Sequence, residues 1–81
     1  MSHEELRAKL RYMANQIATF FKSQSREDGA AGVAEHINKF WEPRMRRQLF
    51  EMTDRSTEGF DPLVVAALDK IRRPEPVREQ G

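Results

Sequence analysis

The chain is predicted to bend at Lys39-Phe40-Trp41-Glu42-Pro43-Arg44-Met45-Arg46-Arg47, a stretch that holds the only Trp of the protein. Pro43 disfavours helical backbone at the residue before it and suits the first position of a new helix. The sequence therefore predicts that one helix ends near Trp41 and that the next begins at Pro43.

On both sides of this bend, apolar residues recur at the three- and four-residue spacing of a helix. The predicted helices cover residues 3–23, 26–41, 43–53 and about 62–72. The first of them carries an apolar stripe, made of Leu6, Leu10, Met13, Ile17, Phe20 and Phe21. Because no segment alternates as a strand would, we expect an all-α fold, a small bundle of three to four helices with the first packed across the others.

Several side chains are suited to cap these helices at their amino ends. Ser2 with Glu5 fits a capping box, and Ser25 with Asp28 offers a similar cap before the second helix. Asp61-Pro62 combines a cap with a preorganised first position for the last helix.

The 81 residues suffice for one small domain, which we place at residues 1–73, followed by a disordered tail at 74–81. Cysteine is absent, which excludes disulfides and thiolate metal sites. No segment approaches the roughly 18 consecutive apolar residues that a membrane span needs. We therefore expect a soluble, cytoplasmic protein that does not contact a membrane.

Residue types that commonly carry catalysis are scarce. The two histidines are His3, near the start, and His36, beside the apolar face of the second helix. Two histidines without cysteine do not assemble a convincing zinc site. Glu35 precedes His36 directly, so the two side chains point about 100° apart on a helix and do not form a dyad by themselves. We therefore predict no catalytic residue, no metal ligand and no enzymatic activity of the chain alone.

Positive charge gathers at the predicted bend. The whole chain has a formal charge of +1, whereas Lys39, Arg44, Arg46 and Arg47 face only one carboxylate within the stretch. One interpretation is a solvated helix face on which Arg47 pairs with Glu51 four residues later. The other is a binding site, in which the guanidinium groups and the free N–H groups of a helix start meet a phosphate or a partner's carboxylate.

The aromatic residues of the bend also admit two interpretations. Phe40 and Trp41 fall on the apolar face of the second helix, which favours a place in the core. Trp and Arg are also the usual anchors of protein interfaces. The candidate partner-binding residues are therefore Phe40, Trp41, Arg44, Arg46 and Arg47.

Three blocks of the sequence carry a family resemblance. They are Met13-Ala14-Asn15-Gln16-Ile17 with Phe20-Phe21, the run from Ile37 to Arg46, and Asp61-Pro62-Leu63-Val64 with Ala67-Leu68. Together they resemble the delta subunit of cytoplasmic, NAD-dependent, molybdenum-containing formate dehydrogenases. The Trp-x-Pro-Arg-Met-Arg pattern in the second block is the specific one, and Ala18 departs from the Gly expected in many relatives.

The resemblance implies a small helical accessory subunit without an active site. It implies binding to the large molybdenum-containing catalytic subunit, whose assembly or cofactor insertion the small subunit would support. The complex would use bis-molybdopterin guanine dinucleotide, iron–sulfur clusters, FMN and NAD, and we expect none of them to be held by this chain.

Three other functions stay open on the sequence. A chaperone-like protein would hold the phosphates of a guanine nucleotide cofactor with Arg44, Arg46 and Arg47. A helix-turn-helix protein would read DNA with the Arg-rich third helix, although the low net charge and an inward Met45 and Leu49 argue against nucleic acid. The isolated chain would alternatively form a homodimer.

Overall fold

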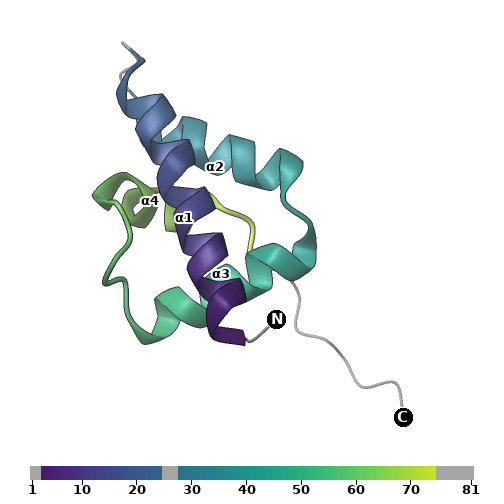
Figure 1. Ribbon diagram of the computed structural model, residues 1–81. Helices are drawn as coiled ribbons and strands as arrows, with labels where there is room; N and C mark the ends of the chain where they lie inside the picture. The colour runs from purple at the N-terminus through teal and green to yellow at the C-terminus, as the bar shows by residue number, and fades with distance from the viewer. Residues whose placement is uncertain (1–2, 25–27, 75–81) are drawn as a thin grey trace.

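The computed structural model describes residues 3–24 and 28–74 of the chain. The elements are α1 (His3–Lys22), α2 (Gly29–Phe40), α3 (Pro43–Arg55), α4 (Pro62–Ala67) and the 3₁₀ turn η1 (Leu68–Lys70) (Figure 1). The prediction of a small all-α bundle is confirmed.

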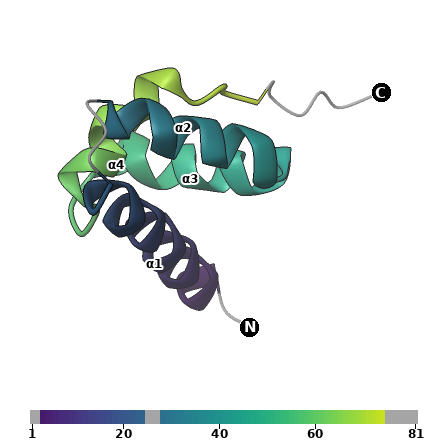
Figure 2. The ribbon, with the colours of Figure 1, turned by 90° about the horizontal axis from the view of Figure 1, so that it is seen from above.

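Helix α1 lies across the other helices on one side of the molecule, as predicted (Figures 1 and 2). It packs against α2, α3 and α4, and α2 packs in addition against α4 and η1. Seen from above, the segment that follows η1 lies on the side of α2 opposite to α1 (Figure 2). Between these elements lies a single core, whose largest fully buried side chains are Val33, Ile37, Leu49 and Val64.

The buried face of α1 differs from the predicted stripe. Its centre is the row Leu10, Ala14 and Ala18, while the longer Met13 and Ile17 are only partly buried beside it. Small side chains let a helix approach its neighbours closely, so the alanines take the positions of closest contact. Phe20 was expected in the core and is 57% exposed, which makes that part of the prediction wrong.

Helix α2 begins three residues later than predicted, because Asp28 caps it. The Asp28 side chain accepts a hydrogen bond from the backbone N–H of Ala31 at 3.1 Å, which satisfies one of the free donors of the first turn. Two of the predicted caps, Ser2 and Ser25, lie outside the described residues.

The predicted bend between α2 and α3 is confirmed. Trp41 and Glu42 both have extended backbone, and Pro43 occupies the first turn of α3. The N–H of Trp41 still bonds the carbonyl of Ile37 at 2.9 Å, so α2 is completed before the chain turns. Helix α3 continues two residues beyond the predicted end, to Arg55.

The last helix is shorter than predicted. It ends at Ala67, tightens into η1, and Ile71 is already extended. The cause lies on α2, where the Asn38 side chain donates to the carbonyl of Lys70 at 3.2 Å and accepts from the N–H of Arg72 at 2.8 Å. Asn38 thus binds the backbone groups on either side of Ile71 and holds this segment extended. Apart from Pro74, the predicted tail at 74–81 lies outside the described residues.

Candidate functional site

Trp41 lies in the core at the bend between α2 and α3. Its side chain is 5% exposed and belongs to the same cluster as Ile37 and Leu49. In the isolated chain Trp41 is therefore a core residue, as the first of the two interpretations predicted. It packs at the corner where α3 begins.

Phe40, the neighbouring residue, points to the surface. Its side chain is 69% exposed, and its ring lies 4.8 Å from the half-buried ring of His36, one turn earlier on α2. Phe40 is the last residue of α2 and Trp41 already has extended backbone, and the two side chains point in different directions, one to the surface and one into the core. His36 therefore contacts an exposed aromatic ring at the rim of the molecule.

The three arginines of the bend are not equivalent. Arg44 is exposed, whereas Arg46 and Arg47 are half-buried, and each of the latter two has a buried Nε without a hydrogen-bond partner among the described residues. Arg46 Nη1 donates to the carbonyl of Arg72 at 2.6 Å. The predicted pair between Arg47 and Glu51 does not form among the described residues. Arg46 thus bonds to the backbone of the segment after η1 while its side chain stays half-exposed.

The segment after η1 lies against α2 and α3, an arrangement that the sequence did not reveal. Arg73 donates two hydrogen bonds to the Asp54 carboxylate, at 2.8 and 3.1 Å, and its guanidinium lies 4.1 Å from the centre of the Phe50 ring. The hydrogen bonds to Arg73 lower the pKa of Asp54, and the same contact raises the pKa of Arg73. The contacts of Asn38, Arg46 and Asp54 thus hold this segment across two helices.

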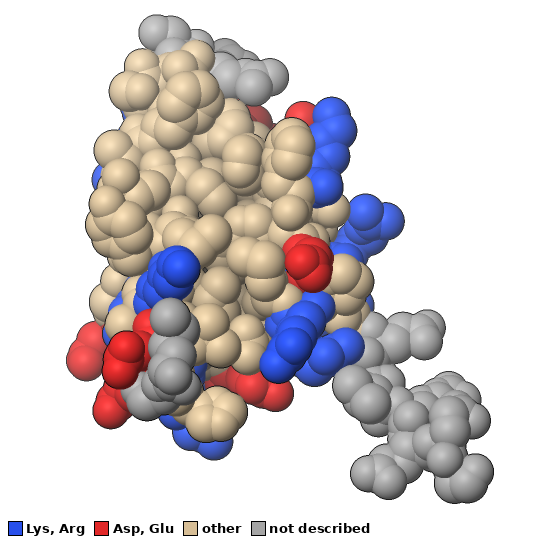
Figure 3. All heavy atoms as spheres, turned by 45° about the vertical axis from the view of Figure 1, so that its right-hand side comes forward, with Lys and Arg blue, Asp and Glu red and all other residues tan. Residues whose placement is uncertain are grey.

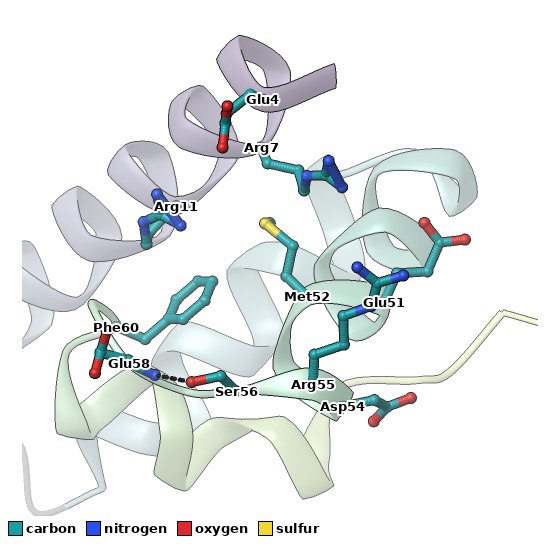
Figure 4. A pocket seen from close by; sticks show the side chains of 10 residues that line it. All are labelled: Glu4, Arg7, Arg11, Glu51, Met52, Asp54, Arg55, Ser56, Glu58 and Phe60. Carbon is teal, nitrogen blue, oxygen red and sulfur yellow. Dashed lines mark hydrogen bonds between the residues drawn. The ribbon is translucent and has the colours of Figure 1, made fainter. Parts of the chain in front are cut away.

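A hollow of about 790 Å³ opens between α1, the end of α3 and the loop that follows it (Figure 4). It is lined by Glu4, Arg7, Arg11, Glu51, Met52, Asp54, Arg55, Ser56, Glu58 and Phe60. Arg11 lies 6.0 Å from the centre of the Phe60 ring, and the hydroxyl of Ser56 accepts from the N–H of Glu58. The lining therefore presents charges of both signs over a nearly buried apolar floor and is suited to ionic contacts.

A second, smaller hollow of about 410 Å³ lies beside α2. Its charged lining residues are Lys39, Lys70, Arg72 and Glu35. None of the three cations has an ion-pair partner within residues 3–24 and 28–74. This hollow is a basic edge that includes Lys39, the residue before Phe40.

No group of three or more His, Asp or Glu side chains lies close enough together to hold a metal ion within the part of the chain that the structure describes. None of its helices has the length and apolarity needed to cross a bilayer.

The structure thus separates the five candidate partner-binding residues. Phe40 and Arg44 are exposed at the bend, and Trp41 lies in the core. Arg46 and Arg47 are half-buried. Their role in binding stays a prediction. Two exposed aromatic residues on α1, Tyr12 and Phe20, were missed as candidates, although the buried row through Ala14 and Ala18 would have placed both on the outer side of the helix.

Comparison with curated proteins gives no match. One family model does match, over residues 9–68, which include most of α1 and all of α2, α3 and α4. Its description is the NADH-dependent formate dehydrogenase delta subunit FdsD. The matched stretch contains all three blocks on which the resemblance was based. The chain therefore belongs to the FdsD family of formate dehydrogenase delta subunits.

Proposed function

We propose that this chain is a cytoplasmic accessory subunit of formate dehydrogenase that carries no active site of its own. It binds the large molybdenum-containing catalytic subunit and supports the assembly of that subunit or the insertion of its cofactor. The observation that carries the proposal is the family match over three quarters of the chain, together with an exposed Phe40 that directly follows Lys39 of the basic hollow. Aromatic residues and Arg are enriched at protein interfaces.

The residues of the bend take different parts in this proposal. Phe40 and Arg44 are the direct contacts, because their side chains are exposed. Trp41 acts from the core by fixing the corner, and Arg46 acts by holding the carbonyl of Arg72. Arg47 contributes charge near the corner with a half-buried side chain.

The cofactors of the complex are expected on other subunits. A nucleotide pyrophosphate would need several guanidinium groups open toward one point. Arg46 is already bonded to a backbone carbonyl, and the Nε atoms of Arg46 and Arg47 are buried, so Arg44 is the one fully exposed residue of the three. The arrangement therefore fits the phosphates of bis-molybdopterin guanine dinucleotide poorly, and direct binding of that cofactor is the weaker alternative.

The experiment uses the native host in two forms, one with a tagged copy of this chain and one with its gene deleted. We expect the tagged chain to bring down the large catalytic subunit. We expect the deletion strain to reduce NAD with formate more slowly and to contain less molybdenum per large subunit. Phe40→Ala and Arg44→Glu should lower the recovery of the large subunit without changing the thermal unfolding of the chain.

Three results would overturn the proposal. A tagged chain that recovers no large subunit removes the binding role. Normal formate oxidation and normal molybdenum content in the deletion strain remove the assembly role. Reduction of NAD by the purified chain with formate alone would show that it carries an active site.

A further inference from the structure

Two helices share an exposed aromatic face on the side of the molecule away from the loop between α3 and α4. On α2 it follows the row Gly32, His36 and Phe40, spaced four residues apart and therefore on one side of the helix. On α1 it follows two neighbouring rows with the same spacing, namely Met13, Ile17, Phe21 and Tyr12, Gln16, Phe20. These three rows are called the aromatic face below.

Ring contacts connect the rows into one surface. Phe20 packs edge-on against Phe21 with 5.1 Å between the ring centres. The Phe21 ring in turn lies directly over Gly32, so close that a Cβ there would be 2.6 Å from two ring atoms. One turn further along α2, His36 contacts Phe40. The aromatic side chains therefore follow one another from the end of α1 to the end of α2.

The outermost of these side chains are exposed in the part of the chain that the structure describes. Phe40 and Phe20 are mostly exposed, and Tyr12 is 63% exposed. Val65 on α4, outside the face, is the one other large apolar residue exposed within the described part of the chain. Exposed aromatic residues that gather on one side of a small domain mark a surface that another molecule covers.

The aromatic face is uncharged and has a basic edge. None of the residues in its three rows carries a carboxylate, an ammonium or a guanidinium group. Figure 3 shows a broad surface without charged side chains over the upper and central part of the molecule, with Lys and Arg along its right-hand edge, an Asp or Glu among them, and charges of both signs below. At the Phe40 end, Lys39, Lys70 and Arg72 line the basic hollow with Glu35.

The charges at the edge of the aromatic face favour an acidic partner protein over a second copy of this chain. A second copy of the chain would bring the same cations toward the same edge, and like charges across an interface oppose association. A partner with carboxylates around an apolar centre would bury the rings and pair with the unpaired cations.

We infer that the aromatic face docks on a patch of the large catalytic subunit that is apolar in its middle and carries Asp and Glu where it meets Lys39, Lys70 and Arg72. The inference rests on the proposed function and adds the surface of α1 to the corner at Phe40. Phe20 and Tyr12 are therefore interface residues, although they lie far from the bend in sequence.

The test measures how much large subunit each tagged variant recovers from the native host. The variants are Phe20→Ser and Tyr12→Ser, with Val65→Ser as the control for loss of an exposed apolar side chain elsewhere. We expect the Phe20→Ser variant to recover roughly tenfold less large subunit than wild type, the scale of an interface anchor. Val65→Ser should recover as much as wild type, and circular dichroism should give equal thermal midpoints for all of these chains.

The basic edge is tested with the variants Lys39→Glu and Arg72→Glu. Both should lower the recovery of the large subunit, and added salt should lower it further.

If wild type recovers the large subunit and both α1 variants recover it equally well, the aromatic face is not the docking surface, while the proposed function stands. If wild type recovers nothing, the proposed function fails first. Higher recovery with the charge-reversed variants would contradict the acidic partner. A dimer of the purified chain that Phe20→Ser converts to monomer in sedimentation would assign the face to a second copy.

Discussion

Asn15 on α1 accepts a hydrogen bond from the backbone N–H of Asp61 at 2.8 Å, through its Oδ1 atom. The Nδ2 atom of the same side chain donates to the carbonyl of Gly59 at 2.9 Å. One amide thus binds the backbone on both sides of the buried Phe60, at the point where the chain enters α4. These two hydrogen bonds of Asn15 hold the start of α4 against α1.

We predict that Asn15→Ala destabilises the protein by about 2 kcal/mol, because two hydrogen bonds of about 1 kcal/mol net each are lost. The measurement is the free energy of unfolding in urea, followed by circular dichroism. Gln16→Ala, at the exposed neighbouring position, is the control and should change stability by less than about 0.5 kcal/mol. Equal stability of Asn15→Ala and wild type would mean that Asn15 does not hold the loop.

Asp61 secures the same junction with its carboxylate. The carboxylate accepts from Lys22 Nζ at 2.6 Å and from the N–H of Leu63 at 2.9 Å, and the side chain is 15% exposed. The bond from Lys22, and after it the bond from Leu63, lower the pKa of Asp61. The ionised carboxylate therefore stabilises the fold above its ordinary pKa of about 3.9, and this contribution is lost as the pH falls through the lower pKa of the folded state.

For Asp61→Asn we predict a loss of roughly 1 kcal/mol at pH 7, where the wild-type carboxylate is fully ionised. The difference in unfolding free energy between wild type and variant should shrink as the pH is lowered below about 4. Asp69→Asn, on exposed η1, serves as the control and should follow wild type across the range. A constant difference between pH 7 and pH 3 would show that the charge of Asp61 has no part in its effect.

Local sequence signals were sufficient to predict the fold class and the position of the bend. Pro43 acts on the residue beside it, so the end of α2 and the start of α3 could be predicted within a residue or two. Capping by Asp61 and Pro62 is equally local, which explains why the start of α4 was also correct.

The parts that sequence reasoning missed depend on contacts between distant residues. Phe20 and Ala18 both fit a helical apolar stripe on α1, and only the positions of α2 and α4 decide that Ala18 is buried and Phe20 exposed. The early end of the last helix depends on Asn38, which lies more than 30 residues away in the sequence. At the candidate site, the sequence pattern could not separate Phe40 from Trp41, because both fit the apolar face of the predicted second helix.

Asn38 should govern the local opening of the segment after η1. In Asn38→Ala, the N–H of Arg72 loses its acceptor, and we predict that its exchange with solvent deuterium becomes roughly five- to tenfold faster, as expected for about 1 kcal/mol. Glu35→Ala, an exposed change on the same helix, is the matched control. Unchanged exchange at Arg72 in Asn38→Ala would mean that Arg46 and the packing of Ile71 hold the segment without Asn38.

The contact between Gly32 and Phe21 makes the outcome of a glycine substitution depend on a second residue. Alanine is favoured over glycine inside a helix by about 1 kcal/mol, so Gly32→Ala would stabilise α2 if space allowed. A Cβ at this position meets the Phe21 ring at 2.6 Å, and the displacement of a packed ring costs about 1 to 3 kcal/mol. We therefore predict that Gly32→Ala destabilises the wild-type background by up to about 2 kcal/mol.

In a Phe21→Ala background the obstructing ring is gone, and the same Gly32→Ala change should stabilise the protein by up to about 1 kcal/mol. The four proteins of this double-mutant cycle are compared by urea unfolding, and the change of sign between backgrounds measures the coupling of the two sites. The control is Gly29→Ala, whose Cβ would meet the flexible end of Leu63 at 3.2 Å. Its effect should be the same with and without Phe21, because the Phe21 ring is not among the atoms that this Cβ meets. An equal effect of Gly32→Ala in both backgrounds would show that α1 and α2 do not meet at this contact, and that the Phe21 ring does not join the two halves of the aromatic face.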